Sequence, residues 1–305
     1  MNIDPIIFQF DLGFTLLTVR WYGLLIVLGA LSAAFYGAWY VRREGRDPNI
    51  IWDALVWILL SGIVGARVWY VVADIIGGNS RYIDDPISIV RVDQGGLNIL
   101  GGVMFAAIAG WYFTKRNRVD FWLLADAVGP GYLIGQAIGR LGNYINQELY
   151  GPPTTLPWGI QIEAQHRIAP WNDISQFPVE TTLFHPTYAY ELIWNLVLAG
   201  LIIYFFARQN HKTPAGVIAG ASLMATGLGR TILEAFFRPD QPDFFNLGIS
   251  TSMVVSIIFF LLGLFIVLVK SGKISVSFMQ PGPTEYPRES TRRPHVPRNV
   301  RRNKA

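Results

Sequence analysis

Arginine, amide and carboxylate side chains occur close together in GRLGNYINQELYG, residues 139–151, after a long apolar stretch. At about 100° per residue, a helix would place Arg140, Asn143 and Gln147 on one face, with Glu148 about 80° from Arg140. A polar face on a membrane helix needs protein partners or a ligand. Arginine binds phosphate through paired, charge-assisted hydrogen bonds, and asparagine amides can orient hydroxyl groups. The segment therefore predicts an anion-binding site.

A second charged group lies within another apolar stretch, where Arg230, Glu234 and Arg238 are spaced by four residues. On a helix this spacing allows a purely structural arginine–glutamate–arginine ladder. Two arginines around one glutamate nevertheless leave positive charge to be satisfied. We therefore expect an anionic ligand here as well.

Three further residues have both a functional and a structural interpretation. Arg67 ends an apolar stretch, where it could bind a ligand or extend its charge to the membrane surface. His185 precedes Pro186 at the start of another stretch and could be catalytic or could only position a helix. Tyr22 taken alone is an ordinary interfacial aromatic residue.

The elements that carry these residues are membrane spans. Of the 305 residues 51% are hydrophobic and 15% are charged, whereas a soluble domain has about 25% charged residues; the mean hydropathy is +0.33. Crossing a bilayer takes about 20 apolar residues. Seven stretches qualify, which predicts an all-α polytopic membrane protein with transmembrane helices near 20–41, 51–73, 97–114, 121–140, 186–207, 214–237 and 248–270.

The distribution of lysine and arginine among the loops predicts the orientation. Seventeen of the 25 lie in one alternate set of loops and in the C-terminal segment, and five lie in the other set. By the positive-inside rule the N-terminus is outside and the C-terminus is cytoplasmic. The polar segments 74–96 and 141–185 then form a small extracytoplasmic head, and the unusual residues gather near the outer leaflet.

Two domains follow from this organisation. Residues 1–273 form the seven-helix transmembrane domain. Residues 274–305 form a basic, proline-rich, disordered cytoplasmic tail, which either touches anionic lipid or only fixes the orientation. Because the basic residues follow the topology, the pI near 9.3 does not indicate nucleic-acid binding.

The composition excludes several kinds of chemistry. With no cysteine, the chain has no disulfide, no thiol nucleophile and no cysteine-ligated metal. The four histidines lack the spacing of a zinc motif, so we expect neither a metal nor another cofactor. The predicted anion site needs a ligand that is anionic and reachable from the outer leaflet. A phospholipid headgroup meets both requirements.

The motifs together resemble a known family. GRLGNYINQELYG is similar to the signature of the prolipoprotein diacylglyceryl transferases, and RWYGLLIVLG, GARVWYVV, HPTYAYE and GRTILEAFFRPD resemble other blocks of that family in the same order. The resemblance covers roughly residues 18–270. It implies a transferase of the bacterial plasma membrane that moves the diacylglyceryl group of phosphatidylglycerol onto the lipobox cysteine of a prolipoprotein signal peptide, releasing glycerol phosphate. Its partners would be these two substrates and membrane lipid, with no nucleic acid.

The resemblance also implies roles for individual residues. Arg140 and Arg230 would hold the headgroup phosphate and stabilise the departing glycerol phosphate. The expected catalytic set is Arg140, Arg230, Tyr22, Glu148 and His185, and the expected phosphatidylglycerol-binding set is Arg140, Asn143, Asn146, Gly151, Arg230, Glu234 and Arg67.

One position departs from the family pattern. GGLNILGG has Leu100 where the family commonly has a histidine, often proposed to help activate the thiol, and leucine cannot accept a proton. His185 or Glu148 could replace that histidine, or the arginines could supply most of the rate. A non-catalytic phospholipid-binding relative and a lipid transporter with an outward-facing basic cavity are the alternatives. The cytoplasmic halves of the spans look apolar, which favours the enzyme over the transporter.

Overall fold

The computed structural model describes residues 4–11, 16–91, 95–208, 213–237 and 249–282. The described chain divides into two compact units, one built from residues within 1–56 and 122–284 and the other from residues within 57–121. The first unit contains Tyr22, Arg140, His185 and Arg230. The second contains Arg67 and Leu100.

Each predicted span corresponds to a helix in the described part of the chain. These helices are α1 (Trp21–Arg43), α2 (Asn49–Ile76), α4 (Ile99–Asn117), α5 (Phe121–Ile145), α6 (Thr187–Ile202), α7 (Val217–Phe237) and α8 (Thr251–Lys270). Four of them, α1, α2, α8 and α6 with its π-helical continuation to Ala207, are long and apolar enough to cross a membrane. The protein is therefore a mostly helical, multi-pass membrane protein.

The helices expose large apolar side chains on their outer faces. Phe35 of α1, Leu60 of α2, Ile193 of α6 and Leu261 of α8 are 64%, 62%, 58% and 55% exposed. So much apolar surface is unfavourable in water. Lipid chains are the solvent that suits these faces.

The expectation of a purely α-helical fold is wrong in detail, because the first unit also contains two small antiparallel sheets. Strand β1 (Ile6–Asp11) pairs with β2 (Leu16–Arg20), and β3 (Pro153–Thr154) pairs with β4 (Leu183–Phe184). β2 reads LLTVR, and its β-branched threonine and valine favour an extended chain. This strand leads directly into α1.

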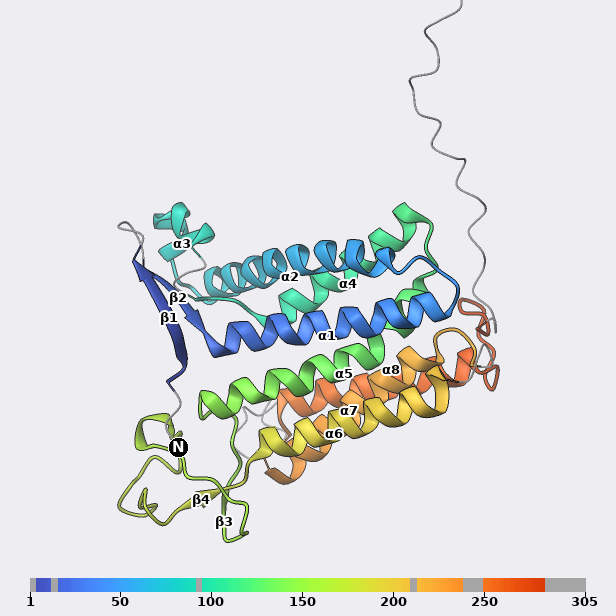
Figure 1. The fold of residues 1–305 in the computed structure, drawn as a ribbon. Helices are drawn as coiled ribbons and strands as arrows, with labels where there is room; N and C mark the ends of the chain where they lie inside the picture. Colours follow the sequence, from blue (N-terminus) through green and yellow to red (C-terminus); the bar gives the residue numbers. More distant parts are fainter. Residues whose placement is uncertain (1–3, 12–15, 92–94, 209–212, 238–248, 283–305) are drawn as a thin grey trace, which may run out of the picture. The chain divides into compact units, whose positions relative to one another are not determined.

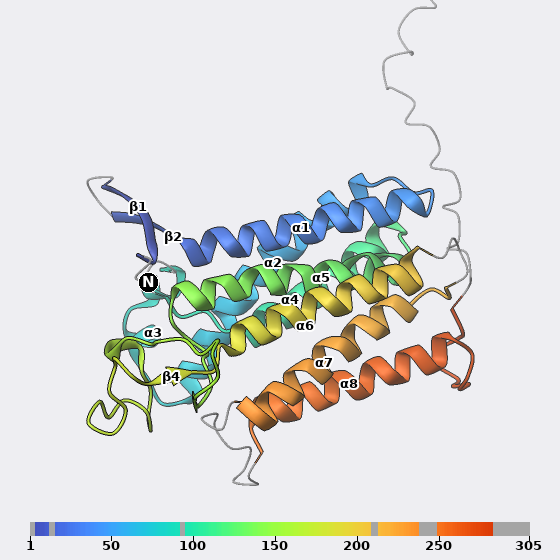
Figure 2. The same cartoon turned by 60° about the horizontal axis from the view of Figure 1, so that its bottom comes forward.

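Within the first unit, α1, α5, α6, α7 and α8 run alongside one another, and both sheets lie at the same end of the bundle (Figures 1 and 2). Successive helices alternate in direction. The first turns of α1 and α6 and the last turns of α5 and α7 therefore lie at that end. The topology alone thus places Tyr22, Arg140, His185 and Arg230 toward the same end of the unit.

The chain between α5 and α6 forms a small head with its own core. Tyr150, Ile162, Trp171 and Phe184 are buried against one another. Arg167 is buried beside them, donates hydrogen bonds to the carbonyls of Ile162 (2.8 Å) and Phe177 (2.5 Å), and lies over the Phe184 ring. The segment predicted as extramembrane structure is therefore folded.

The beginning of the predicted tail is also folded. Lys270 Nζ donates to the Gln280 carbonyl at 3.0 Å, and the Gly282 N–H donates to the Lys270 carbonyl at 2.9 Å. Residues 274–282 thus turn back onto the end of α8, and residues 283–305 lie outside the described residues. The expected disorder is not found in 274–282.

Candidate functional site

The end of α5 sets the position of Glu148. The Glu148 N–H donates to the Asn143 carbonyl at 3.0 Å and the Gln147 N–H to the Tyr144 carbonyl at 3.1 Å, the paired bonds of a Schellman motif. Gln147 has φ 51°, a left-handed conformation that costs a non-glycine residue about 1–2 kcal/mol. The turn folds the chain back over the last helical turn, and Glu148 comes to lie beside Asn143.

This turn alters the polar face predicted from the sequence. Because α5 ends at Ile145, the shared helical face includes Arg140 and Asn143 but not Gln147. The Gln147 amide oxygen instead accepts the N–H of Glu163 at 2.9 Å, which ties the head to the end of α5. Gln147 also lines a cavity of about 520 Å³ between the head and the last turn of α5.

Two asparagines hold the Glu148 carboxylate. Glu148 Oε1 accepts Asn143 Nδ2 at 2.8 Å and Asn146 Nδ2 at 3.4 Å. The oxygen of the Asn143 amide accepts Arg140 Nη1 at 3.0 Å. The buried Asn143 thus connects the arginine to the carboxylate.

Glu191 of α6 joins the two predicted arginines. Its Oε1 accepts Arg140 Nη2 at 2.5 Å, and its Oε2 pairs with Arg230 Nη1 at 3.3 Å. The side chains of Arg140, Arg230 and Glu191 are 17%, 22% and 8% exposed. One carboxylate therefore bridges the guanidinium groups of α5 and α7.

The remaining donors of Arg230 link α7 to the start of α8. Arg230 Nη2 lies 2.6 Å from Glu234 Oε1, and its Nε donates to Ser252 Oγ at 3.3 Å. Ser250 donates to the other Glu234 oxygen at 3.1 Å while it accepts the Met253 N–H as the N-cap of α8. We call Arg140, Asn143, Glu148, Glu191, Arg230 and Glu234 the arginine–carboxylate network.

The charges of this network differ from the expected surplus of positive charge. Among the described residues Glu191 and Glu234 neutralise Arg140 and Arg230, and Glu148 adds a negative charge. Arg238, the third member of the predicted ladder, lies outside the described residues. Glu191 was not among the candidate residues predicted from the sequence. An acidic residue within an apolar span was the signal that could have found it.

Tyr22 of α1 packs against α5 because residue 142 is glycine. A Cβ built on Gly142 would lie 2.5 Å from Tyr22 Cδ2, so the tyrosine ring packs directly on the α5 backbone. Gly142 lies between Arg140 and Asn143 in the sequence. The structure thus brings Tyr22 of α1 beside the signature on α5.

Gly151 is closely packed against the start of α6 and the end of α7. Its N–H donates to the His185 carbonyl at 2.8 Å, and a Cβ there would lie 2.9 Å from both the Phe237 carbonyl and the Thr187 side chain. The Thr187 hydroxyl donates to the Leu149 carbonyl. These contacts fasten the signature segment to the start of α6 and the end of α7.

His185 lies in an aromatic pocket at the start of α6. Its Nδ1 is 3.0 Å from the Tyr190 hydroxyl, which also accepts Trp158 Nε1 at 2.8 Å. The surrounding cavity has a volume of about 300 Å³ and is lined mainly by apolar side chains. Burial lowers the pKa of His185 below its ordinary value, which favours the neutral imidazole near pH 7.

Arg67 has a different environment from the one expected of a phosphate-binding residue. In the second unit its Nε and Nη atoms donate five hydrogen bonds, of 2.6 to 2.9 Å, to the carbonyls of Ser88, Ile89, Arg91, Gly95 and Gly96. A guanidinium has five N–H donors, so none is left for a ligand. Arg67 holds residues 88–91 and 95–96 in place, and we remove it from the candidate phosphate-binding set.

Leu100 lies in the first turn of α4, and its N–H is capped by the Asn98 side chain at 2.9 Å. The leucine side chain is 48% exposed. It offers no acceptor for a proton. Any general base must come from another residue.

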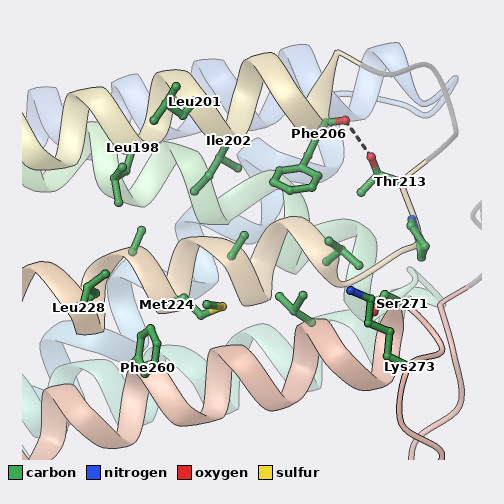
Figure 3. A pocket seen from close by; sticks show the side chains of 15 residues that line it. Leu198, Leu201, Ile202, Phe206, Thr213, Met224, Leu228, Phe260, Ser271 and Lys273 are labelled. Carbon is green, nitrogen blue, oxygen red and sulfur yellow. Dashed lines mark hydrogen bonds between the residues drawn. The ribbon is translucent and has the colours of Figure 1, made fainter.

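A separate apolar groove lies away from the network in the first unit. Side chains of α6, α7 and α8, including Leu198, Ile202, Met224 and Phe260, line a hollow of about 610 Å³ (Figure 3). Thr213 closes one end by donating to the Phe206 carbonyl at 3.0 Å, and Lys273 lies at the same end. Arg140, Glu191 and Arg230 are not among its lining residues.

These features define an integral membrane protein in which ionised side chains near several helix ends form one partly buried polar network. The chain matches the prolipoprotein diacylglyceryl transferase family over residues 5–269. We conclude that the chain belongs to this family of transferases.

Curated relatives agree with this assignment. The protein is 37% identical to a phosphatidylglycerol–prolipoprotein diacylglyceryl transferase of Bifidobacterium adolescentis over 279 residues, 88% of this chain and 80% of the relative. It is 37% identical to one of Chloroflexus aggregans over 211 residues, 69% and 68% of the two chains. It is 35% identical to one of Trichormus variabilis over 252 residues, 81% and 84% of the two chains.

Proposed function

We propose that this protein transfers the diacylglyceryl group of phosphatidylglycerol to the thiol of the lipobox cysteine of prolipoproteins and releases glycerol phosphate. This is the first step of bacterial lipoprotein maturation. The observation that carries the proposal is the pair of half-buried arginines, Arg140 and Arg230, joined within one network in a member of this family. The names of its relatives contain both substrates.

The proposed reaction is a substitution at carbon. The thiolate sulfur of the acceptor attacks the carbon of the diacylglycerol part that carries the phosphate ester oxygen, a C–S bond forms, and the bond between that carbon and the oxygen breaks. The electron pair leaves with the oxygen, so the phosphodiester with one negative charge becomes a monoester with about −1.5 to −2 near pH 7. Negative charge therefore grows on the phosphate during the reaction.

Arg140 and Arg230 are suited to stabilise this growing charge. Guanidinium groups bind phosphate oxygens through paired N–H donors, and donors aimed at developing charge accelerate reactions. In this proposal both arginines hold the phosphate, Asn143 and Asn146 orient the glycerol hydroxyls, and Glu148 fixes the two amides. Glu234 holds Arg230 in position, and Gly151 packs the signature against α6.

The acceptor thiol needs less help than the leaving group. A thiol with a pKa of about 8.5 is already a few per cent thiolate near pH 7. Burial lowers the pKa of His185 and so favours the neutral imidazole, which can accept the thiol proton, and Tyr22 packs next to Gly142. We propose His185 as the base in place of the side chain that Leu100 lacks.

The proposed topology has seven transmembrane helices in residues 1–273, with the N-terminus outside and the C-terminus in the cytoplasm. The lysine and arginine distribution supports this orientation. The network then faces the outer leaflet of the bacterial plasma membrane, segments 74–96 and 141–185 lie outside, and the basic segment 274–305 lies inside. A prolipoprotein signal peptide and phosphatidylglycerol both reach the network from this side.

Leu100 favours one competing function, a phospholipid-binding relative without catalysis. A single assay separates the two functions. Purified protein is incubated with phosphatidylglycerol and a lipobox peptide, and a mass gain of one diacylglyceryl group on the cysteine supports the transferase. Folded protein that binds the lipid but leaves the peptide unmodified supports the competing function.

A further inference from the structure

Glu191 occupies the space between the two arginines in the way a bound phosphate would. Its two oxygens contact different guanidinium groups, Oε1 that of Arg140 at 2.5 Å and Oε2 that of Arg230 at 3.3 Å. A phosphodiester likewise presents two non-bridging oxygens to a pair of arginines. The carboxylate and a lipid phosphate therefore compete for the same donors.

The charge of the described network strengthens this competition. The described network contains two arginines and the three carboxylates of Glu148, Glu191 and Glu234, so its formal net charge is −1. An incoming phosphodiester adds another negative charge. Binding becomes more favourable when one carboxylate gives up its arginine contacts.

Glu191 is the carboxylate best placed to do so. Glu234 is one helical turn from Arg230 on α7 and is held by Ser250, and Glu148 is held by two asparagines. The hydrogen bonds of Glu191 in the described structure come from the two arginines. Its departure therefore frees donors on both arginines without leaving another donor unpaired.

We propose that Glu191 is an internal counter-anion that yields both arginines to the lipid phosphate and returns to expel glycerol phosphate. This rests on the proposed function. Since the product carries more negative charge than the lipid, its release is the step that most needs a competing anion. Glu191 acts through the arginines and is thus a positioning residue.

The test uses the full-length protein and the variant Glu191→Gln, which keeps the size of the side chain and removes its charge. We expect the inhibition constant of glycerol phosphate and the KM for phosphatidylglycerol to fall about tenfold, the effect of removing one charge-assisted hydrogen bond, while kcat falls because product leaves slowly. Loss of a purely structural contact would weaken binding of both molecules. An unchanged or raised inhibition constant overturns the proposal.

Two further variants keep the result interpretable. Glu191→Asp retains the charge but is too short to bridge both arginines, so its inhibition constant should lie between those of the parent and Glu191→Gln. If Glu191→Gln folds poorly, the inhibition constant of Glu191→Asp should still lie below that of the parent. Glu180→Gln, on the exposed surface of the head, should match the parent. Direct titration of glycerol phosphate into the parent and into Glu191→Gln measures its affinity for each and tests the inference even if no transfer occurs. A parent that binds glycerol phosphate but does not transfer lipid would refute the proposed function and leave this inference standing.

Discussion

Replacing Arg140 by lysine tests whether the shape of the guanidinium matters beyond its charge. Arg140 uses separate nitrogen atoms for two acceptors, Nη1 for Asn143 at 3.0 Å and Nη2 for Glu191 at 2.5 Å. A lysine ammonium keeps the charge, but it is too compact to bind both acceptors at once and cannot form the two parallel hydrogen bonds by which a guanidinium binds a phosphate. We expect Arg140→Lys to fold and to bind lipid, and to lose most of its transfer rate.

The expected magnitude follows from the hydrogen bonds that a lysine at this position cannot make. Removing one hydrogen bond to a charged group costs about 1.5–3 kcal/mol, and removing one donor to developing negative charge lowers kcat about 10²- to 10³-fold. The assay is the initial rate of diacylglyceryl transfer to a lipobox peptide, with thermal unfolding measured in parallel. Arg91→Lys, a half-exposed arginine in a loose 3.9 Å ion pair, is the matched control and should stay within about twofold of the parent. A folded Arg140→Lys protein within about threefold of the parental kcat would refute the phosphate-clamp reasoning.

Other variants test separate parts of the mechanism and the fold. Gly142→Ala forces the Tyr22 ring away and should lower stability by about 1–3 kcal/mol and remove most of the transfer rate. Gly139→Ala is the control and should be neutral, because no atom lies within 4 Å of the added Cβ. Thermal unfolding curves and transfer rates are measured for both variants. Arg67→Gln leaves backbone carbonyls unpaired and should lower stability by about 3 kcal/mol or more, without raising the KM for phosphatidylglycerol in the folded protein. The pKa of His185 is lowered on folding, so the free energy of unfolding is highest above about pH 6.5 and falls on acidification, as the unfolded chain binds the proton more readily. The free energy of unfolding should therefore depend less on pH in His185→Gln. An unchanged slope of this free energy against pH would contradict the prediction. Leu100→His should leave an active parent active; a parent without activity that this change revives would mean that Leu100 had disabled it.

The sequence predicted the helices well because each lies in a largely apolar stretch, and four of them are long and apolar enough to cross a membrane. The alternation of helix direction then placed Tyr22, Arg140, His185 and Arg230 at one end of the first unit. The β1–β2 hairpin and the fold of residues 274–282 were not predicted. Their short segments are held by backbone pairing and by a lysine–carbonyl contact, which leave no periodic hydrophobic pattern.

The candidate site was predicted in its residue types more reliably than in its pairings. Arg140 and Asn143 share a helix face as expected, but a Schellman turn removes Gln147 from that face and turns Glu148 back. Arg67 and Arg230 looked equivalent as charged residues in spans. Their difference depends on which carbonyls or carboxylates distant chain segments bring to them, and one sequence does not encode this locally.

The most direct test of the central claim is the measurement of both products in a single incubation. Phosphatidylglycerol, a lipobox peptide and the purified protein should yield diacylglyceryl peptide and glycerol phosphate in equal amounts. Arg140→Ala and Arg230→Ala, inserted and folded like the parent, should yield neither product. Transfer at the parental rate by either variant, or lipidated peptide without glycerol phosphate, would contradict the claim that these two arginines stabilise the departing phosphate.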